Sequence, residues 1–480
     1  MELVRNKTVA FHTLGCKLNY SETSTLSRLL ESEGFEKREF DEHADVYVIN
    51  TCSVTDNADK ECRHLVRRIQ RKSPESLVVI TGCYAQLKPA AIAAIPGVDL
   101  VLGAAEKFNI VQHLKELSKG DSARICSCDI EDVSGFNVSF SLNDRTRTFL
   151  KVQDGCDYTC SFCTIPMARG KSRSDSISRT VESVRKIAAE GTVKEIVLTG
   201  VNLGDFGKGP EGARGGEAGK TGDGGKAGDA ARTGGLLPVG MEAGRTVEPV
   251  SMATGKTETM ESMNMATGRK EDFFGLMKEL DTIEGIERYR ISSIEPNLLS
   301  PEMIEWVAGS RKFMPHFHIP LQSGSDRILG LMRRRYKRDL YASRVQLIKA
   351  LMPHCAIGVD VIVGFPGETD GHFQETFEFL HELEVSYLHV FTYSERDHTK
   401  ALEIEPVVPI AIRNERNKIL RNLSYQKMQY FTRQHDGQVR KVLLEGHVKT
   451  GVMEGYTDNY IKVTTPYRPE WVNQVIDWKL

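Results

Sequence analysis

The sequence predicts an α/β protein of several domains, and three observations support this prediction. At 480 residues the chain is longer than one ordinary hydrophobic core, so about two to four domains are expected. Apolar strand patterns alternate with helical patterns over most of the chain, which is typical of parallel sheets covered by helices. Residues 438–480 instead alternate apolar and polar positions between turns. We therefore expect an N-terminal doubly wound parallel sheet, a second series of βα units and a small C-terminal β-barrel.

The composition excludes some classes of protein. The net charge is −2, so overall charge predicts no particular partner. The sequence has no apolar run of about 18 residues, which predicts no membrane span. The polar start of the chain is not a secretory signal. Ten cysteines without such a signal favour a reducing, cytoplasmic location, where thiols bind metals or take part in chemistry.

The predicted N-terminal domain, residues 1–118, places three cysteines just after strands. Strand patterns cover residues 9–14, 46–50, 77–81 and 98–102, and helical patterns cover residues 22–33, 56–72, 89–95 and 106–117. Cys16, Cys52 and Cys83 follow the first three strands. Because ligands bind beyond the carboxyl ends of strands in open α/β sheets, we expect these cysteines to converge on one edge. A metal site is favoured over the alternative of three unrelated buried thiols.

Four other cysteines of the chain show no comparable pattern. Cys126 and Cys128 lie in a connector, residues 119–147, with no further ligand nearby, so we interpret them as ordinary thiols. Cys62 lies in a helical pattern and Cys355 opens a strand pattern, and we assign neither a function.

The βα alternation resumes in the predicted second domain, residues 142–408. Six strand patterns cover residues 149–153, 195–199, 289–293, 316–321, 356–363 and 387–392. Helical patterns between them include residues 178–190, 339–351 and 372–383. Six βα units fit a partial barrel, and active sites of such barrels lie at the carboxyl ends of the strands.

One loop of this domain carries the most specific motif in the chain. Cys156, Cys160 and Cys163 have the spacing C-x3-C-x2-C, and thiolates are the usual ligands of iron–sulfur clusters. A four-iron cluster held by three cysteines leaves one iron without a protein ligand, and an open position marks a catalytic centre. A zinc site is the alternative, but it usually needs a second cysteine pair or histidines, which are missing nearby. The aromatic ring of Phe162 is expected to flank a flat ligand.

The loop motif resembles the signature of the radical S-adenosylmethionine (SAM) superfamily, and the two sets of cysteines together resemble the methylthiotransferase family. Residues 200–202, 292–296, 316–326 and 360–369 also match that family. The resemblance implies a partial (β/α)6 barrel and two 4Fe-4S clusters, an auxiliary one on the N-terminal cysteines and a SAM-binding one on the loop cysteines. It also makes five polar residues near barrel strand ends candidates for SAM contacts, with capping or loop hydrogen bonding as the alternative: Asn202, Ser293, Glu295, Gln322 and Asp360.

A glycine-rich segment, residues 208–268, interrupts the second domain. It contains no aromatic residue and has nearly balanced charge. Such a composition cannot bury enough apolar surface to order a chain. We therefore expect a disordered surface loop and assign it no function.

The C-terminal part is predicted to bind RNA. A helical pattern at residues 410–434, within a linker of residues 410–437, is rich in Arg and Lys, which suits a phosphate backbone better than a merely solvated face here. Residues 438–480 resemble a short TRAM domain, a small β-barrel that binds RNA in this family. The predicted tRNA contacts are Arg413, Arg416 and Arg421 in the helix and Arg169, Lys171 and Arg173 after the cysteine loop. The second group is an equally good candidate for reading a carboxylate on the substrate.

These features predict a radical SAM methylthiotransferase that acts on tRNA. By resemblance, one SAM methylates a sulfur at the auxiliary cluster, and a second yields a 5′-deoxyadenosyl radical that activates a C–H bond. Residues 15–19 and 163–174 most resemble the branch that modifies C2 of N6-threonylcarbamoyladenosine 3′ to the anticodon. The alternatives are the isopentenyladenosine branch, the branch that modifies a ribosomal-protein aspartate, and a non-catalytic iron–sulfur regulator that binds RNA. Expected partners are the tRNA anticodon stem-loop and an electron donor such as a flavodoxin or ferredoxin, and the sulfur donor is not predicted.

Overall fold

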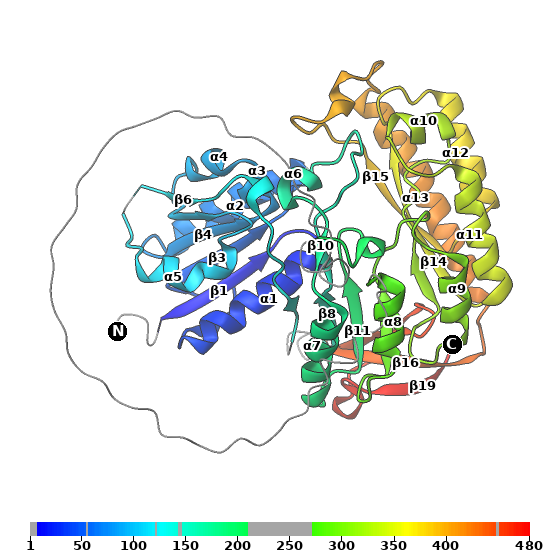
Figure 1. Ribbon diagram of the computed structural model, residues 1–480, viewed down its shortest axis with the longest axis horizontal. Helices are drawn as coiled ribbons and strands as arrows, with labels where there is room; N and C mark the ends of the chain where they lie inside the picture. Colours follow the sequence, from blue (N-terminus) through cyan, green and yellow to red (C-terminus); the bar gives the residue numbers. More distant parts are fainter. Residues whose placement is uncertain (1–6, 54–55, 121, 143–145, 210–270, 448–450) are drawn as a thin grey trace, which may run out of the picture. The chain divides into compact units, whose positions relative to one another are not determined.

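The computed structural model of the protein (Figure 1) describes residues 7–53, 56–120, 122–142, 146–209, 271–447 and 451–480. The predicted glycine-rich loop lies outside the described residues, apart from residues 208 and 209. Among the described residues, no helix is both long and apolar enough to cross a membrane.

The N-terminal domain is built on a six-stranded parallel sheet. Its strands are β1 (Thr8–Thr13), β2 (Glu36–Arg38), β3 (Val46–Thr51), β4 (Leu77–Gly82), β5 (Leu100–Leu102) and β6 (Arg124–Cys126), in the order β2-β1-β3-β4-β5-β6. Every residue of β3 and β4 is buried, as expected for parallel strands with helices on both faces. The strand order reverses between β1 and β3, and ligands bind at such switch points, beyond the carboxyl ends of the strands.

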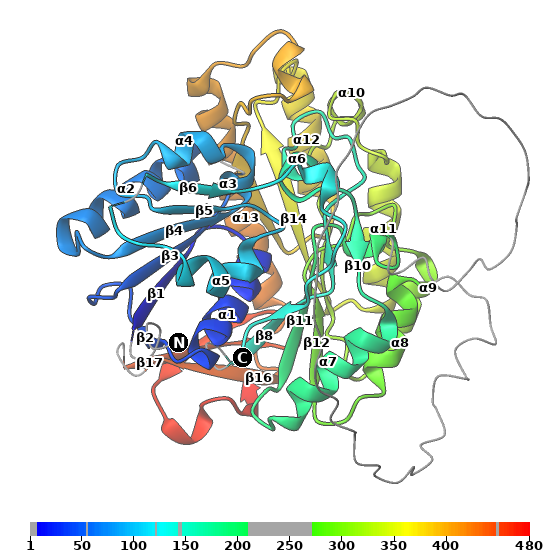
Figure 2. The same cartoon turned by 60° about the vertical axis from the view of Figure 1, so that its left-hand side comes forward.

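Two helical layers cover this sheet (Figure 2). Helices α1 (Lys17–Ser32) and α5 (Ile110–Lys115) pack on one face, through side chains such as Leu26 and Leu114. Helices α2 (Asp56–Lys72), α3 (Cys83–Leu87) and α4 (Pro89–Ala93) pack on the other face. The sequence did not predict α3, β2 or β6, because α3 is a single buried turn and the two edge strands are mostly exposed and lack an apolar pattern.

The central domain has six parallel strands in two connected sheets. Strands β8 (Arg147–Lys151), β11 (Glu195–Thr199) and β12 (Arg288–Ile291) form one sheet with the short antiparallel β7 (Ser139–Phe140). Strands β13 (His316–His318), β14 (Ala356–Val363) and β15 (Tyr387–Thr392) form the other. A parallel bridge between Tyr289 and Phe313 connects the two sheets. The predicted fold class, with six βα units in this domain, is confirmed.

Helices cover the outside of these sheets (Figure 2). They are α7 (Ile177–Ala189), α8 (Phe273–Asp281), α9 (Pro301–Gly309), α10 (Asp326–Leu331), α11 (Arg338–Leu351) and α12 (Asp370–Glu382). Apart from Ile328 of α10, which packs in a smaller cluster with Phe365, their apolar side chains and those of the strands form one continuous core, which includes Leu198, Leu276 and Val359. The core fixes the strands, so the loops at their carboxyl ends keep defined positions.

The chain leaves the central domain through α13 (Ile410–Arg433) and ends in a four-stranded antiparallel sheet. Its strands are β16 (Val439–His447), β17 (Val452–Thr457), β18 (Lys462–Pro466) and β19 (Val475–Lys479), in the order β18-β17-β16-β19. The predicted small C-terminal β-domain is therefore present as a four-stranded antiparallel sheet. Within the described residues its two outer strands, β18 and β19, do not pair with each other, so the sheet does not close into the predicted barrel.

This C-terminal sheet is fixed to the amino ends of β12 and β13. Arg290 Nη2 donates to the Thr457 carbonyl oxygen at 2.7 Å, and Arg288 Nη2 donates to the Lys441 carbonyl oxygen at 2.8 Å. The ring of Tyr460 stacks on His316 with 3.9 Å between ring centroids and 8° between planes. These directional contacts hold the C-terminal sheet in one position against the central domain.

Candidate active site

Cys16, Cys52 and Cys83, the N-terminal triplet, lie just beyond the carboxyl ends of β1, β3 and β4. The backbone of Gly15 has a φ of 107°, and a Cβ atom there would lie 2.9 Å from Cys52 Sγ. Gly82 has a φ of 97°, and a Cβ atom there would lie 2.3 Å from the carbonyl oxygen of the residue before Cys52. Only glycine allows the three turns to approach one another this closely.

Arg169 joins this triplet to the central domain. It is the last residue of α6 (Ile165–Arg169), and its side chain is buried. The guanidinium donates to Asn19 Oδ1 at 2.6 Å and to Glu22 Oε1 at 3.1 Å, both on α1. Within its own domain it donates to Asp154 Oδ1 at 2.9 Å. Burial works against the charge, but neighbouring Cys83 and the carboxylates raise the pKa of Arg169 well above its ordinary value.

Glu22 is the centre of a buried charge network between the two domains. Its carboxylate accepts hydrogen bonds from Lys107 Nζ of the N-terminal domain at 2.7 Å and from Lys151 Nζ of β8 at 3.0 Å. Burial opposes ionisation, but Arg169 and the two lysines hold the pKa of Glu22 well below its ordinary value. Removing one member of such a buried network leaves an uncompensated charge, which is strongly destabilising. The network therefore fixes the N-terminal triplet relative to β8 and α6.

Cys156, Cys160 and Cys163, the loop triplet, lie between β9 (Gln153–Asp154) and α6. Each sulfur accepts a hydrogen bond: Cys156 from the Tyr158 N–H at 3.4 Å, Cys160 from Arg334 Nη1 at 3.3 Å, and Cys163 from the Ile165 N–H at 3.5 Å. Burial raises the pKa of the Cys156 thiol to about 11 and that of Cys163 to about 12. Both shifts disfavour the thiolate form of Cys156 and Cys163, and a bound cation would favour it.

The spacing of the cysteines suits a cluster better than a single ion. In the described part of the chain, the one group of three His, Cys, Asp or Glu residues whose ligand atoms all lie within 4.8 Å is His318, Asp360 and His389. Neither cysteine triplet is that compact, whereas a tetrahedral zinc ion brings its sulfur ligands to about 3.8 Å from one another. The sulfurs of the loop triplet, which accept hydrogen bonds, match the surroundings of iron–sulfur clusters.

A cavity of about 240 Å³ beside the loop triplet is lined by three of the predicted cofactor-binding residues, Phe162, Gln322 and Asp360. Phe162 packs edge-to-face on Phe365, with 6.2 Å between ring centroids. Gln322 has a φ of 69°, and its N–H donates to the Asp360 carbonyl oxygen at 2.8 Å. A non-glycine residue in this conformation is strained, and such strain concentrates at functional sites. The cavity also contacts Cys163.

The remaining predicted cofactor-binding residues lie near strand ends but outside this cavity. Glu295 pairs with Arg334, the same side chain that donates to the loop triplet, and burial raises the pKa of Glu295 despite that cation. Asn202 is buried, and its Nδ2 donates to Asp205 at 2.9 Å. Its Oδ1 has no hydrogen-bond partner among the residues that the structure describes. Ser293 is partly buried just after β12.

Two of the three basic residues after the loop triplet are not exposed. Arg169 belongs to the buried network, and Arg173 is also buried, with Nη1 donating to the Arg169 carbonyl oxygen at 2.5 Å. Both side chains are held by contacts within the protein, so their predicted contact with tRNA or a substrate carboxylate stays a prediction that this structure does not support. Lys171 is exposed, as a phosphate contact requires.

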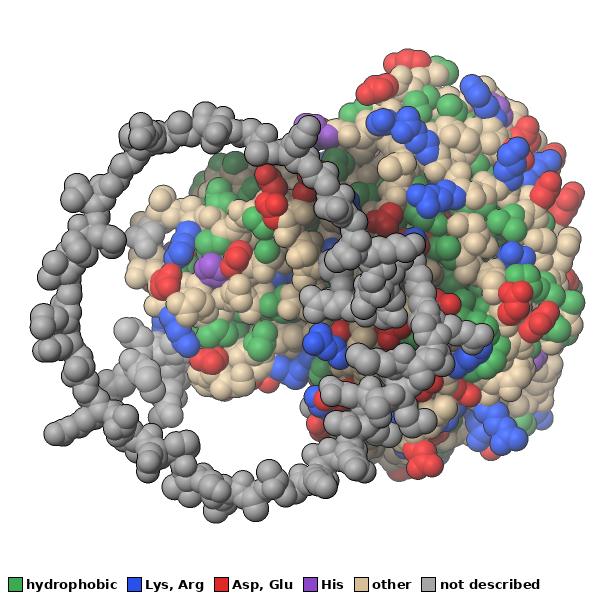
Figure 3. All heavy atoms as spheres, in the orientation of Figure 1, with side chains coloured by type: hydrophobic (Ala, Val, Ile, Leu, Met, Phe, Trp, Pro, Cys, Tyr) green, Lys and Arg blue, Asp and Glu red, His purple; other side chains and the backbone are tan. Residues whose placement is uncertain are grey.

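The basic helix α13 shows the same division. Arg413 and Arg416 are buried and pair with Glu395 and Glu368, both at 2.6 Å. Their predicted role as tRNA contacts likewise stays a prediction that this structure does not support, while Arg421 is exposed. On the face shown in Figure 3, Lys and Arg side chains are interspersed with Asp and Glu rather than gathered in one patch. A run of basic residues in the sequence therefore mixes structural and exposed cations.

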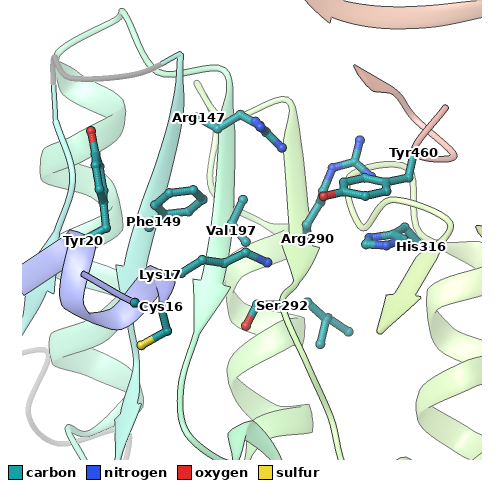
Figure 4. A pocket seen from close by; sticks show the side chains of 12 residues that line it. Cys16, Lys17, Tyr20, Arg147, Phe149, Val197, Arg290, Ser292, His316 and Tyr460 are labelled. Carbon is teal, nitrogen blue, oxygen red and sulfur yellow. The ribbon is translucent and has the colours of Figure 1, made fainter. Parts of the chain in front are cut away.

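A second cavity, of about 260 Å³, lies beside Cys16 and was not predicted (Figure 4). Its lining includes Lys17 of α1, Arg147 of β8, Arg290 of β12 and Tyr460 of the C-terminal domain. Arg147 opens its strand, whereas active-site residues of such barrels are expected at the carboxyl ends. The signal available in the sequence was Lys17, a cation next to a predicted cluster ligand.

Comparison with known proteins identifies the family. The profile described as "Uncharacterized protein family UPF0004" matches residues 8–103, and that of the "Radical SAM superfamily" matches residues 253–380. The chain is 36% identical over 488 residues to the threonylcarbamoyladenosine tRNA methylthiotransferase MtaB of Bacillus subtilis (strain 168). That alignment covers 98% of this chain and 93% of the relative. The chain belongs to the radical SAM methylthiotransferase family.

Two further proteins place this methylthiotransferase among its relatives. The tRNA-2-methylthio-N(6)-dimethylallyladenosine synthase of Clostridium botulinum (strain Loch Maree / Type A3) is 29% identical, over 91% of this chain and 86% of the relative. The radical SAM methyltransferase TsrM from Kitasatospora setae has a TM-score of 0.51 at 13% identity, over 82% of this chain and 77% of that chain, which shows a shared fold. The predicted family and enzyme class are thus confirmed.

The two matched segments differ in their position relative to the two cysteine triplets of this methylthiotransferase. The N-terminal triplet lies within the UPF0004 match, residues 8–103. The loop triplet precedes the radical SAM match, residues 253–380. Membership in a radical SAM family implies a 4Fe-4S cluster and SAM as cofactors.

Proposed function

We propose that this methylthiotransferase acts on tRNA and installs a methylthio group at C2 of N6-threonylcarbamoyladenosine, 3′ to the anticodon. The observation that carries the proposal is the whole-chain similarity. Identity is 36% to the relative named for threonylcarbamoyladenosine and 29% to the one named for dimethylallyladenosine. Both relatives are named for methylthio transfer to tRNA, so the proposal concerns the N6 substituent as much as the reaction.

The donor sets fit two iron–sulfur clusters. We assign a SAM-binding 4Fe-4S cluster to the loop triplet and an auxiliary 4Fe-4S cluster to the N-terminal triplet. Three cysteines at each site leave one iron open, for SAM at one and for sulfur at the other. When bound, the clusters supply the electron that cleaves SAM and the position from which sulfur is transferred, which acid–base groups cannot do at an aromatic C–H. A flavodoxin or ferredoxin is the proposed electron donor.

The chain's own side chains orient these sites. Arg334 donates to Cys160 Sγ at 3.3 Å and pairs with Glu295, so one cation is shared between a cluster ligand and a carboxylate. We assign the neighbouring cavity to SAM, because Phe162 offers an aromatic face and Gln322 offers donors and an acceptor. The buried network around Glu22 keeps the two triplets at a fixed separation, as a reaction between bound groups requires.

Exposed cations and the C-terminal domain are the proposed tRNA contacts. Lys171 lies close in sequence to the loop triplet, and Arg421 lies in the middle of α13, the helix that precedes the C-terminal sheet. Phosphate contacts of this kind make affinity fall as salt rises. An anticodon-loop base must leave its stack to reach the triplets, as single-stranded RNA bases do in other complexes.

The proposal is tested by an anaerobic assay with reconstituted protein and two tRNAs, followed by mass spectrometry of the nucleosides. One tRNA carries threonylcarbamoyladenosine and the other isopentenyladenosine at the same position. We expect the methylthio product from the first and little from the second. Equal conversion of both, or conversion of the second alone, overturns the substrate assignment. Cleavage of SAM with no modified nucleoside from either tRNA argues for a different substrate.

A further inference from the structure

Among the residues that the structure describes, those lining the cavity beside Cys16 include three cations and no carboxylate. Its three charged lining residues are Lys17, Arg147 and Arg290. His316 also lines it, but burial lowers the pKa of His316 well below its ordinary value, so the imidazole is neutral. The other lining residues are aromatic, aliphatic, hydroxylic or small. The cavity is therefore electropositive, with an apolar wall.

Two of the three cations are already paired. Arg147 Nε donates to Glu445 Oε1 at 2.5 Å, and Arg290 Nε donates to Glu195 Oε1 at 2.9 Å. Lys17, by contrast, has neither an ion pair nor a hydrogen bond to its ammonium group within the described residues. One positive charge is thus left free to face the cavity. An anionic group gains a charge-assisted hydrogen bond there without displacing a protein carboxylate.

The size and position of the cavity suit part of a nucleotide. Its volume of about 260 Å³ lies below the ~300–1,000 Å³ of pockets that hold whole drug-sized ligands. Figure 4 shows Lys17 extending across the cavity toward Arg290 and Tyr460, while Cys16, the preceding residue, points away from them. A ligand whose anionic group binds Lys17 therefore has another part of its structure beside the N-terminal triplet.

We propose that this cavity binds the carboxylate-bearing N6 substituent of the substrate base and that Lys17 recognises its negative charge. The inference rests on the proposed function and names its specificity-determining residue. C2 and C6 of adenine flank the same ring nitrogen, so a base with C2 beside the N-terminal triplet can place its N6 substituent in the adjoining cavity. An isopentenyl group offers no anion and leaves the ammonium without a partner, which disfavours its binding. This assignment replaces Arg169 and Arg173, which are not accessible.

The charge of the substituent is tested directly with two substrates. One is an anticodon stem-loop RNA that carries the threonylcarbamoyl group as the free acid, and the other carries it as the methyl ester. The reconstituted full-length protein is expected to prefer the acid in kcat/KM by about 10- to 100-fold, the range of a hydrogen bond between charged groups. The K17M variant is expected to bring this ratio close to one, mainly by losing activity on the acid, whereas K17R keeps most of the preference.

Controls separate recognition from cluster loss. The K72M variant removes an exposed lysine at the end of α2 and is expected to keep the wild-type ratio. Iron content reports whether a substitution next to Cys16 disturbs the N-terminal triplet. An acid-to-ester ratio near one in the wild-type protein overturns the proposal without any variant, and so does a wild-type ratio that persists in K17M. If the wild-type protein converts neither RNA, the proposed substrate itself is wrong, which is a distinct outcome.

Discussion

The two cysteine triplets are assembled in opposite ways. The loop triplet lies within residues 156–163, and two of its sulfurs accept hydrogen bonds from backbone N–H groups of residues two positions further along. The N-terminal triplet comes from three turns separated by whole βα units, and the parallel pairing of β1, β3 and β4 brings these turns together. A local site takes all its ligands from one loop, whereas a site built by sheet topology exists only when the sheet is folded.

This difference determines what each triplet depends on. The N-terminal triplet needs the close approach at Gly15 and Gly82 and the buried charges around Glu22, which come from two domains. The loop triplet depends instead on contacts within the central domain, among them the hydrogen bond from Arg334 to Cys160 Sγ and that from the Ser161 N–H to the Met332 carbonyl oxygen. Substitution of Gly15 or Gly82 should therefore affect the N-terminal triplet, and substitution of Arg334 should affect the loop triplet.

The largest expected effect is the loss of a whole cluster. Replacing all three cysteines of either triplet by Ala should lower the iron content of the reconstituted protein by about half, because each triplet is assigned a like cluster. Iron and sulfide analysis of the two triple variants and their combination measures this. Full iron content in the N-terminal variant would contradict the assignment of a cluster to that triplet.

The next effect concerns the buried network. The R169M variant leaves Glu22 and Asp154 buried without their shared arginine, which should lower the free energy of unfolding by about 3–5 kcal/mol. Chemical denaturation measures this change. The matched control is R185M, which removes an exposed arginine on α7 and should change stability by no more than about 0.5 kcal/mol. Equal effects of the two substitutions would show that the network does not hold the domains together.

A smaller effect should appear in the pH dependence of stability. The cations around Glu22 hold its folded-state pKa well below its ordinary value, so its stabilising contribution is complete above the unfolded-state pKa of about 4.3 and is lost as pH falls below it. The Tm of the metal-free protein should therefore fall less steeply with decreasing pH in E22Q than in the wild type. Parallel pH profiles would mean that Glu22 is not ionised in the folded protein.

The smallest expected effect is on the loop triplet. The R334M variant removes the hydrogen bond to Cys160 Sγ and a nearby positive charge, both of which favour the more negative, reduced form of a cluster. The midpoint potential of that cluster should therefore become more negative, while R333M, at an exposed neighbour, should leave it unchanged. Potentiometric titration followed by electron paramagnetic resonance measures both. A shift of the same size in R333M would point to a general effect of surface charge.

Local patterns made much of the fold predictable. Strands β11, β14 and β15 and helix α2 have the predicted bounds, because their apolar periodicity is complete within each element. Strand β2 could not be predicted, since its three residues are exposed and are ordered by pairing with β1. The cysteine loop was identifiable from spacing alone.

The role of the basic residues could not be read from the sequence. Arg169 and Glu22 are 147 positions apart and meet only in the folded chain, so a buried pair looks like part of an exposed basic run. Arg413 and Arg416 also looked like exposed cations in the sequence, because their carboxylate partners meet them only in the folded chain. The cavity beside Cys16 combines residues of three domains, and no local pattern marks such a site.

The most direct test of the central claim is to measure SAM cleavage and methylthio transfer separately in the two triple cysteine variants. The claim is that the two triplets hold clusters with different roles. The variant that lacks Cys156, Cys160 and Cys163 should form no 5′-deoxyadenosine and no modified nucleoside. The variant that lacks Cys16, Cys52 and Cys83 should still cleave SAM under reducing anaerobic conditions but form no methylthio product on tRNA. Methylthio transfer by the second variant, or equal loss of SAM cleavage in both, would contradict the account.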